Sequence, residues 1–406
     1  MKSSSYLFAV ALVVIAATTG WAILAQTLVL RTDAADSSQR QQLAALWGTA
    51  QTQTAPRFSI GWMTRDGNHH LVETESQIAP MSARVDVDLA LDQRQKGLLW
   101  YNTYTVGFAA TYRVTADRDG RLIVRFPFPA ADATYEDVVF TMNGKPIAAT
   151  NGDGHLTASL PIARGQSAEL AVGYRSHGLD TWRYRFGDDA IVGVRDFRLT
   201  MRTNFDAIDF PPQTLSPTEE KRTGGGWTLT WNYSQLVNGF GIGMAFPQKL
   251  QPGPIAQRIT MWAPLSLSFY VFVMLVVTRL RRIELHPMNY LFLAAAFFAF
   301  HLLFAYTVDR IPLGWAFLLC SMVSMALTVS YLRLVVGLRF AAVEAALAQF
   351  FYLILFSYAL FDEGYSGLSI TIGAIVTLFV MMQVTGRFNW SSVTGGGTRT
   401  AAETTA

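Results

Sequence analysis

The stretch RRIELHPMNYLFL, residues 281–293, gathers side chains that could do chemistry. Arginines, Glu284 and His286 lie together between two strongly apolar runs. Such a group could be a catalytic cluster, an ion path or a signal that fixes membrane topology. The choice depends on the elements that hold this stretch in place.

Histidine and cysteine patterns in the chain favour no metal site. No histidine belongs to an HExxH motif or to another metal-ligand spacing on one element. The sequence DRDG at 117–120 begins like a calcium loop but lacks the further oxygen ligands and the closing glutamate, so it predicts a turn. The single cysteine, Cys320, excludes an intramolecular disulfide and a CxxC site. We expect neither a metal nor another cofactor.

The overall composition is typical of a membrane protein. Of 406 residues, 51% are hydrophobic and 15% are charged, where a soluble domain carries roughly 25% charged residues. The formal charge of +3 indicates no basic surface for nucleic acid. No GxSxG elbow, GxxxxGK loop or GxGxxG turn is present. We therefore expect a protein that is not an enzyme and has no nucleic-acid partner.

Long apolar runs predict membrane spans, since about 20 apolar residues cross a bilayer. Tyr6 to Leu30 contains no charged residue and is longer than the roughly 7–15 apolar residues of a cleaved signal peptide. We interpret residues 1–31 as a retained anchor. About five further spans form a predicted bundle at 259–390, and a low-complexity, disordered tail follows at 391–406. The further spans are Ile259–Thr278, Met288–Val308, Ile311–Leu332, Phe340–Phe361 and Gly367–Gly386.

Arginine and lysine near the span ends predict the orientation, because positive loops resist translocation. With Lys2 inside, the clusters at 279–282 and 333–339 also lie inside, and the acidic DEGYSG (362–367) lies outside. Both termini are then cytoplasmic. In the inner membrane of a Gram-negative cell, residues 32–258 would lie in the periplasm. The lipid bilayer is the predicted partner of the helices, and the pattern does not specify an oligomeric state.

The region between the first and second spans predicts an all-β, sandwich-like domain. Asp33 to Gly48 predicts a short helix that leads away from the bilayer, with Asp36 or Ser37 as its candidate cap. Hydrophobicity then alternates with a period of two, which is typical of half-buried antiparallel strands. The clearest run is Tyr104, Val106, Phe108, Ala110, Tyr112 and Val114, and the same alternation starts at Leu122, Phe197 and Trp227.

Few polar residues lie inside the predicted spans. His301 and Gln349 are deep in theirs, and Ser321 and Ser324 form a polar stripe beside Cys320. These groups could line a proton or solute path, or they could make hydrogen bonds between helices. We favour packing, because paired carboxylates and helices broken at mid-membrane, which are typical of transporters, are not evident.

Three motifs give the chain a family resemblance. LHPMNYLFL (285–293), SYLRLVV (330–336) and TGRFNW (385–390) resemble the CreD family of inner-membrane proteins. Asn389 stands where the family has aspartate, and Trp227 where it has phenylalanine. The residues that carry the resemblance are Leu285, His286, Pro287, Met288, Tyr290, Arg387 and Trp390, with Gly226, Trp227 and Trp231 before the bundle.

The resemblance implies a role in cell-envelope integrity or the envelope stress response, with no catalytic residue or cofactor to carry over. We expect the β-domain to bind or scaffold an envelope protein or a peptidoglycan component. One alternative is a transporter or channel that uses the bundle. A second is a transmembrane sensor with a separate cytoplasmic partner.

The opening stretch is then best interpreted as a topology signal. Its arginines hold the turn in the cytoplasm, where Glu284 can pair with them. Pro287 suits the first turn of a helix, and Tyr290 lies where an interfacial aromatic is expected. His286 is either a helix cap or headgroup contact, or a contact specific to the family.

Overall fold

The computed structural model describes residues 3–65, 70–152, 154–187, 192–362, 364 and 366–386. It forms two compact units, one drawn from the described parts of Met1–Thr32 and Leu250–Ala406 and the other from those of Asp33–Lys249. Below they are called the helical unit and the β unit. Two predicted signature residues, Arg387 and Trp390, and the tail at 391–406 lie outside the described residues.

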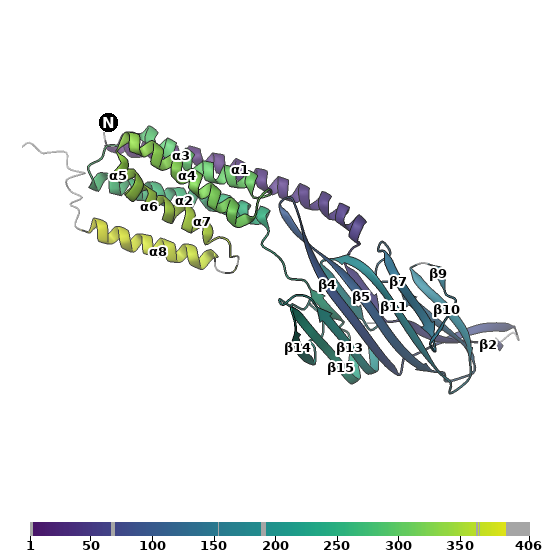
Figure 1. Ribbon diagram of the computed structural model, residues 1–406. Coiled ribbons are helices and arrows are strands. Elements are labelled where there is room, and N and C mark those ends of the chain that lie inside the picture. The colour runs from purple at the N-terminus through teal and green to yellow at the C-terminus, as the bar shows by residue number, and fades with distance from the viewer. Residues whose placement is uncertain are drawn as a thin grey trace, which may run out of the picture. The chain divides into compact units, whose positions relative to one another are not determined.

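Helix α1 (Ser3–Trp47) is one unbroken helix (Figure 1). The helix predicted over residues 33–48 is therefore the last part of α1, and the prediction that it begins at a cap on Asp36 or Ser37 is wrong. No glycine or proline occurs between Leu30 and Trp47 to end the helix. Asp36 instead accepts a hydrogen bond from the Tyr101 hydroxyl, over 3.2 Å.

The largest sheet of the β unit has eight strands. The pairing of β13 with β4 is parallel, and the other pairings in this sheet are antiparallel. In spatial order the strands are β14 (Glu219–Thr223), β15 (Gly226–Asn238), β13 (Val192–Thr203), β4 (Ser82–Lys96), β5 (Leu99–Thr115), β11 (Ser167–Leu179), β7 (Tyr135–Met142) and β8 (Lys145–Pro146).

Two smaller sheets complete the β unit. The five-stranded sheet is antiparallel throughout, and in the three-stranded sheet β1 runs parallel to β12. The first has the order β3 (Leu71–Ile78), β2 (Arg57–Arg65), β6 (Gly120–Pro127), β10 (His155–Ile162) and β9 (Thr150–Gly152). The second has the order β1 (Gln51–Thr54), β12 (Thr181–Arg185) and β16 (Ile242–Ala245).

One hydrophobic core joins the three sheets. Phe58 and Ile60 enter it from the five-stranded sheet, Trp182 and Met244 from the three-stranded sheet, and alternate residues of β4, β5, β11 and β13 from the largest sheet. The alternating residues of β5 from Tyr104 to Val114 are each at most 5% exposed. The predicted all-β, sandwich-like class is confirmed, as are the strand faces read from the period of two.

The helical unit contains the apolar helices. Those long and apolar enough to cross a membrane, among the residues the structure covers, are α1, α2 (Pro252–Leu280), α3 (Pro287–Thr307), α4 (Leu313–Val335) and the stretch Leu338–Tyr358. That last stretch alternates between α and π turns, as α5 (Leu338–Phe340), η1 (Ala341–Ala345), α6 (Ala346–Gln349), η2 (Phe350–Leu355) and α7 (Phe356–Tyr358). A further apolar helix is α8 (Ser366–Thr385).

Candidate functional site

A cavity of about 300 Å³ lies in the β unit, where parts of all three sheets meet. Its walls come from the start of β2, the loop between β3 and β4, the end of β12 and the start of β13. An adjoining hollow of about 430 Å³ shares four lining residues with it: Ala79, Pro80, Gly193 and Val194. The two hollows therefore share a wall.

The deep part of the cavity is aromatic. Tyr112, Tyr184 and Phe197 line it and are each 1% exposed. Phe186 packs edge-on against Phe197, with ring centroids 4.8 Å apart. The hydroxyls of Tyr112 and Tyr184 are hydrogen-bonded to each other over 3.1 Å. The cavity thus combines aromatic walls and one buried hydroxyl pair with the polar side chains of Arg57 and Gln77.

Burial keeps these hydroxyls protonated. Removal from water raises the pKa of Tyr112 well above its ordinary value, and it also raises the pKa of Tyr184, since desolvation disfavours the phenolate. Both groups can therefore act as hydrogen-bond donors at neutral pH.

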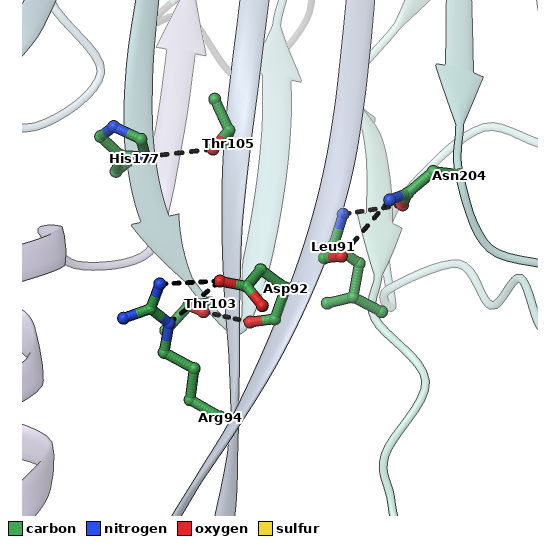
Figure 2. A network of polar contacts seen from close by, with 7 residues as sticks. All are labelled: Leu91, Asp92, Arg94, Thr103, Thr105, His177 and Asn204. Atoms are coloured by element: carbon green, nitrogen blue, oxygen red, sulfur yellow. Dashed lines mark hydrogen bonds and ion pairs between the residues drawn. The ribbon is translucent and has the colours of Figure 1, made fainter.

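A second polar group of the β unit surrounds the ends of β4 and β5 (Figure 2). One oxygen of the Asp92 carboxylate accepts hydrogen bonds from Arg94 Nε and Nη2, over 3.0 and 2.9 Å. The Arg94 guanidinium lies 4.0 Å from the centre of the Trp47 ring. His177 packs edge-on against the same ring at 4.9 Å, and its Nδ1 lies 3.1 Å from Thr105 Oγ1. These contacts fix the end of α1 to the sheet.

The pairing of β13 with β4 ends at Thr203, and beyond it the Asn204 side chain continues the hydrogen bonds to β4 (Figure 2). The Asn204 amide accepts from Leu91 N over 2.8 Å and donates to Leu91 O over 3.3 Å. The Thr103 hydroxyl donates to the carbonyl of Asp92. The group in Figure 2 is therefore satisfied within the β unit, and its evident role is structural.

The polar residues predicted within the spans are all buried, but they do not form one path of hydrogen bonds. Gln349 Nε2 donates to Ser324 Oγ over 2.8 Å, and that hydroxyl donates to the carbonyl of Ala296 over 2.6 Å. This chain joins α6, α4 and α3. Ser321 instead donates to Phe317 O in its own helix, and His301 Nδ1 lies 3.0 Å from Phe297 O in its own.

The signature stretch places its residues at the start of α3. His286 is the N-cap: its Nδ1 accepts a hydrogen bond from Met288 N over 3.2 Å, so the cap interpretation is confirmed. Pro287 occupies the first turn, as expected. Leu285 is buried, and its carbonyl accepts a hydrogen bond from the Tyr6 hydroxyl over 2.9 Å.

Two details of this stretch differ from the prediction. Tyr290 is fully buried within the helical unit, so its ring packs against protein and is not exposed to the surroundings. It packs edge-on against Tyr6, with centroids 6.4 Å apart. Arg281 pairs over 2.7 Å with Glu344 rather than with Glu284, because the turn after α2 lies beside η1. Neither partner could be identified from spacing along the chain.

The signature residues before the bundle have structural roles. At Gly226, a Cβ would lie 1.9 Å from Thr203 O, so no other residue fits there without moving the backbone. Trp231 is fully buried, and its Nε1 donates to Leu215 O over 2.9 Å. Trp227 is half-buried and donates from Nε1 to Asp206 O over 2.8 Å.

No group of three or more histidine, cysteine, aspartate or glutamate residues in the described ranges could hold a metal ion. Sequence reasoning missed the aromatic cavity altogether. Its lining comes from separate strands and loops, so the only available signal was that Tyr112 and Phe197 fall on inward-facing positions.

Comparison with known proteins supports the family resemblance. Residues 223–391 match the family model described as inner membrane protein CreD, and no curated protein matches the chain. The pattern matched therefore includes β15, β16 and the helices from α2 onward.

Among solved structures, the chain is similar to a proposed nutrient-binding protein from Legionella pneumophila, at 11% identity and a TM-score of 0.31, covering 62% of this chain and 84% of that one. It is also similar to an M1 zinc metallopeptidase from Deinococcus radiodurans, at 12% and 0.23, covering 41% and 42%. At these scores neither likeness carries an inference. The family model confirms the resemblance read from the sequence over residues 223–391, and the chain combines a β domain with several apolar helices.

Proposed function

We propose that this protein is not an enzyme and contributes to cell-envelope integrity, or to the response to envelope stress, by binding an envelope component through its β unit. The component is an envelope protein or a peptidoglycan fragment. In this proposal residues 32–258 face the periplasm and both termini face the cytoplasm, as the positive-inside pattern favours. The helical unit holds the β unit at the membrane.

The observation that carries the proposal is the aromatic cavity. Binding sites are commonly concave and largely apolar, with a few well-placed polar groups. Aromatic residues line this cavity, its buried lining residues include Tyr112 and Tyr184, whose hydroxyls bond to each other, and exposed residues such as Ala79 and Gly193 border it. Its aromatic residues belong to the folded core, so the cavity is already formed without a change in conformation.

The proposal is tested by crosslinking in intact envelopes. A photoreactive amino acid at Ala79, on the cavity border, should capture an envelope partner. The same amino acid at Val139, which is 51% exposed on β7 and does not line the cavity, is the matched control. Capture of nothing at position 79 in folded protein, or the same products at both positions, would contradict binding through the cavity.

The orientation has its own test. Reporter fusions near Gly120 and Gly364 should behave as periplasmic, and one near Arg281 as cytoplasmic. A cytoplasmic signal at Gly120 would overturn the proposed topology.

A second candidate function is transport through the helical unit. It is favoured by two buried polar atoms, His301 Nε2 and Gln349 Oε1, that have no hydrogen-bond partner, since polar groups inside a bilayer are often functional. Flux of protons or small solutes into liposomes should then fall for His301→Ala. Absence of flux with well-folded wild-type protein would remove this candidate.

A further inference from the structure

We propose that the cavity binds a compact, uncharged group, as a small molecule or as the terminal group of a larger envelope component, that carries one ring and one hydrogen-bond acceptor. The ring would lie among the aromatic walls, and the acceptor would meet the paired hydroxyls of Tyr112 and Tyr184. This inference rests on the proposed function, because it names the chemical class that the β unit would bind at the same site.

The size of the cavity sets the size of the ligand. A volume of about 300 Å³ is roughly twice the 150 Å³ or so that holds a benzene molecule in a protein interior. One ring with a short substituent therefore fits. A polymer could insert only a terminal group of this size.

The walls favour a ring over a flexible chain. Phe186 and Phe197 meet edge to face, at an interplanar angle of 68°. Phe58 and Tyr112 lie beside each other with centroids 6.2 Å apart. A planar ligand can extend this set of edge and face contacts, which stabilise aromatic pairs beyond the area that they bury.

The paired hydroxyls provide the polar contact. Two hydroxyls carry two protons, and the hydrogen bond between Tyr112 and Tyr184 uses one of them. The second proton has no acceptor among the hydrogen bonds of the described residues. A ligand oxygen or nitrogen at this point would accept it.

Neighbouring core tyrosines show the contrast. Tyr174 donates to Gln53 Oε1 over 2.8 Å, and Tyr104 donates to Thr181 O over 2.9 Å. Their protons are therefore already in use. Among these four core tyrosines, only the pair that lines the cavity leaves a proton without an acceptor, and buried donors are rarely left without one.

The charge of the lining favours a neutral ligand. Arg57 is the one charged residue among the described lining residues of the 300 Å³ cavity, and it already has an interaction partner. The aromatic walls would also disfavour an ion, because a charge loses its hydration there.

Two matched probes test the class of ligand. 4-Fluoroacetophenone has a ring and a carbonyl acceptor, and 4-fluoro-α-methylstyrene has nearly the same shape without the acceptor. Binding to the full-length protein in lipid nanodiscs is measured by ¹⁹F NMR, with empty nanodiscs as the correction for partitioning into lipid. We expect saturable binding of the ketone, roughly 2- to 10-fold tighter than that of the styrene, as one hydrogen bond provides.

Three variants locate the site. Ala79→Trp fills the border of the cavity and should abolish saturable binding of both probes. The double variant Tyr112→Phe with Tyr184→Phe keeps both rings but removes both hydroxyls. It should bind the ketone and the styrene with about equal affinity. Val139→Trp, which adds an indole outside the cavity, should change neither.

Several outcomes would overturn the proposal. If nanodiscs with wild-type protein bind neither probe more than empty nanodiscs do, the cavity does not bind this class of ligand. Equal affinity for the two probes, or a ketone preference that survives the double variant, excludes the hydroxyl pair as the recognition element. Capture of an envelope partner at position 79 without probe binding would leave the proposed function standing and remove only this inference.

Discussion

Strand β5 and helix α4 differ in the side chains that they bury. From Tyr104 to Val114 the inward positions of β5 are apolar and mostly large, and the outward ones between them include Thr105, Gly107 and Thr111. In helix α4 most buried positions are small or polar, and only Phe317 and Leu332 are large and apolar; the small or polar ones are Ala316, Cys320, Ser321, Ser324 and Thr328. The exposed positions of the same helix include the large apolar residues Leu318, Leu319 and Met322.

The difference follows from the solvent on each side. Water outside a β-sheet makes burial of large apolar residues the main source of stability. Lipid outside a helix is as apolar as leucine, so helices associate through close packing of small residues and through hydrogen bonds. Alternating hydrophobicity therefore marks the buried face of β5, whereas small and polar residues mark most of the buried face of α4.

Truncation of the β core should have the largest effect. Trp231→Ala removes a fully buried indole and its hydrogen bond to Leu215 O. We expect the free energy of unfolding of the β unit to fall by about 3–5 kcal/mol. The urea midpoint of the full-length protein in nanodiscs, followed by pulse proteolysis of the β unit, measures this loss.

Trp227→Ala is the matched control on the same strand. Trp227 is half-buried, so less apolar area and a smaller cavity are involved, and the loss should be clearly smaller. Equal losses in the free energy of unfolding for the two variants would show that burial does not determine how much each tryptophan of β15 stabilises the β unit.

Enlargement of a small buried residue should be the next largest effect, now in the helical unit. Ala316 is fully buried in α4, and Ala326 is exposed on the same helix. Ala316→Leu should destabilise the helical unit by about 1–3 kcal/mol through overpacking, while Ala326→Leu should be nearly neutral. Thermal unfolding in nanodiscs compares the two. If both variants lose the same stability, α4 does not pack against its neighbours through the face that contains Ala316.

The same contrast explains what could be predicted from the sequence. Strand faces such as Phe197, Leu199 and Met201 followed from the period of two, because only one side of those strands meets the core. The helices could be placed along the chain, but Tyr290 was assigned to the interface and is buried. All faces of an apolar helix look similar, so its partners depend on packing that spacing does not encode.

Two further features show where local rules end. The cap residues Asp36 and Ser37 resemble a helix start, yet α1 runs through them, because a cap side chain does not break a helix without a glycine or proline. The cavity depends on residues from β2, β5, β12 and β13, which only the tertiary fold brings together. Strand identity was predictable, while the order of strands in each sheet was not.

Loss of one interhelical hydrogen bond should have a smaller effect. Ser324→Ala removes the link between Gln349 and the Ala296 carbonyl. Hydrogen bonds of this kind are worth about 0.6 kcal/mol on average and 1.7 at most within membranes, so the loss should lie near 1 kcal/mol. Ser330→Ala is the control, since Ser330 is exposed and bonds only within its own helix.

A double-mutant cycle of Ser324→Ala and Gln349→Ala isolates the bond itself. The two single losses should sum to more than the loss in the double variant. Strict additivity would mean that the contact contributes nothing to stability, which would weaken the view that these residues serve packing and strengthen the transport candidate.

The smallest expected effect is that of a surface charge on the β unit, where water screens the interaction. Glu75 accepts hydrogen bonds from Arg125, over 2.5 and 3.0 Å, and from Ser59. These bonds lower the pKa of Glu75 from 4.5 to about 2. Because the folded pKa lies below the unfolded one, the stabilisation is complete above pH 4.5 and is lost as the pH falls toward 2.

The Glu75 side chain is 38% exposed, so we discount the contribution to about 0.5–1 kcal/mol, as for surface ion pairs. Glu75→Gln should lower stability by that amount at pH 7 and should flatten the fall in stability between pH 4.5 and 2. Urea midpoints measured across this range, with Glu73→Gln on the same strand as the control, test the prediction. An unchanged acid slope in Glu75→Gln would mean that the acid sensitivity of the β unit arises at other carboxylates, and that water on this face screens the Glu75 and Arg125 pair completely.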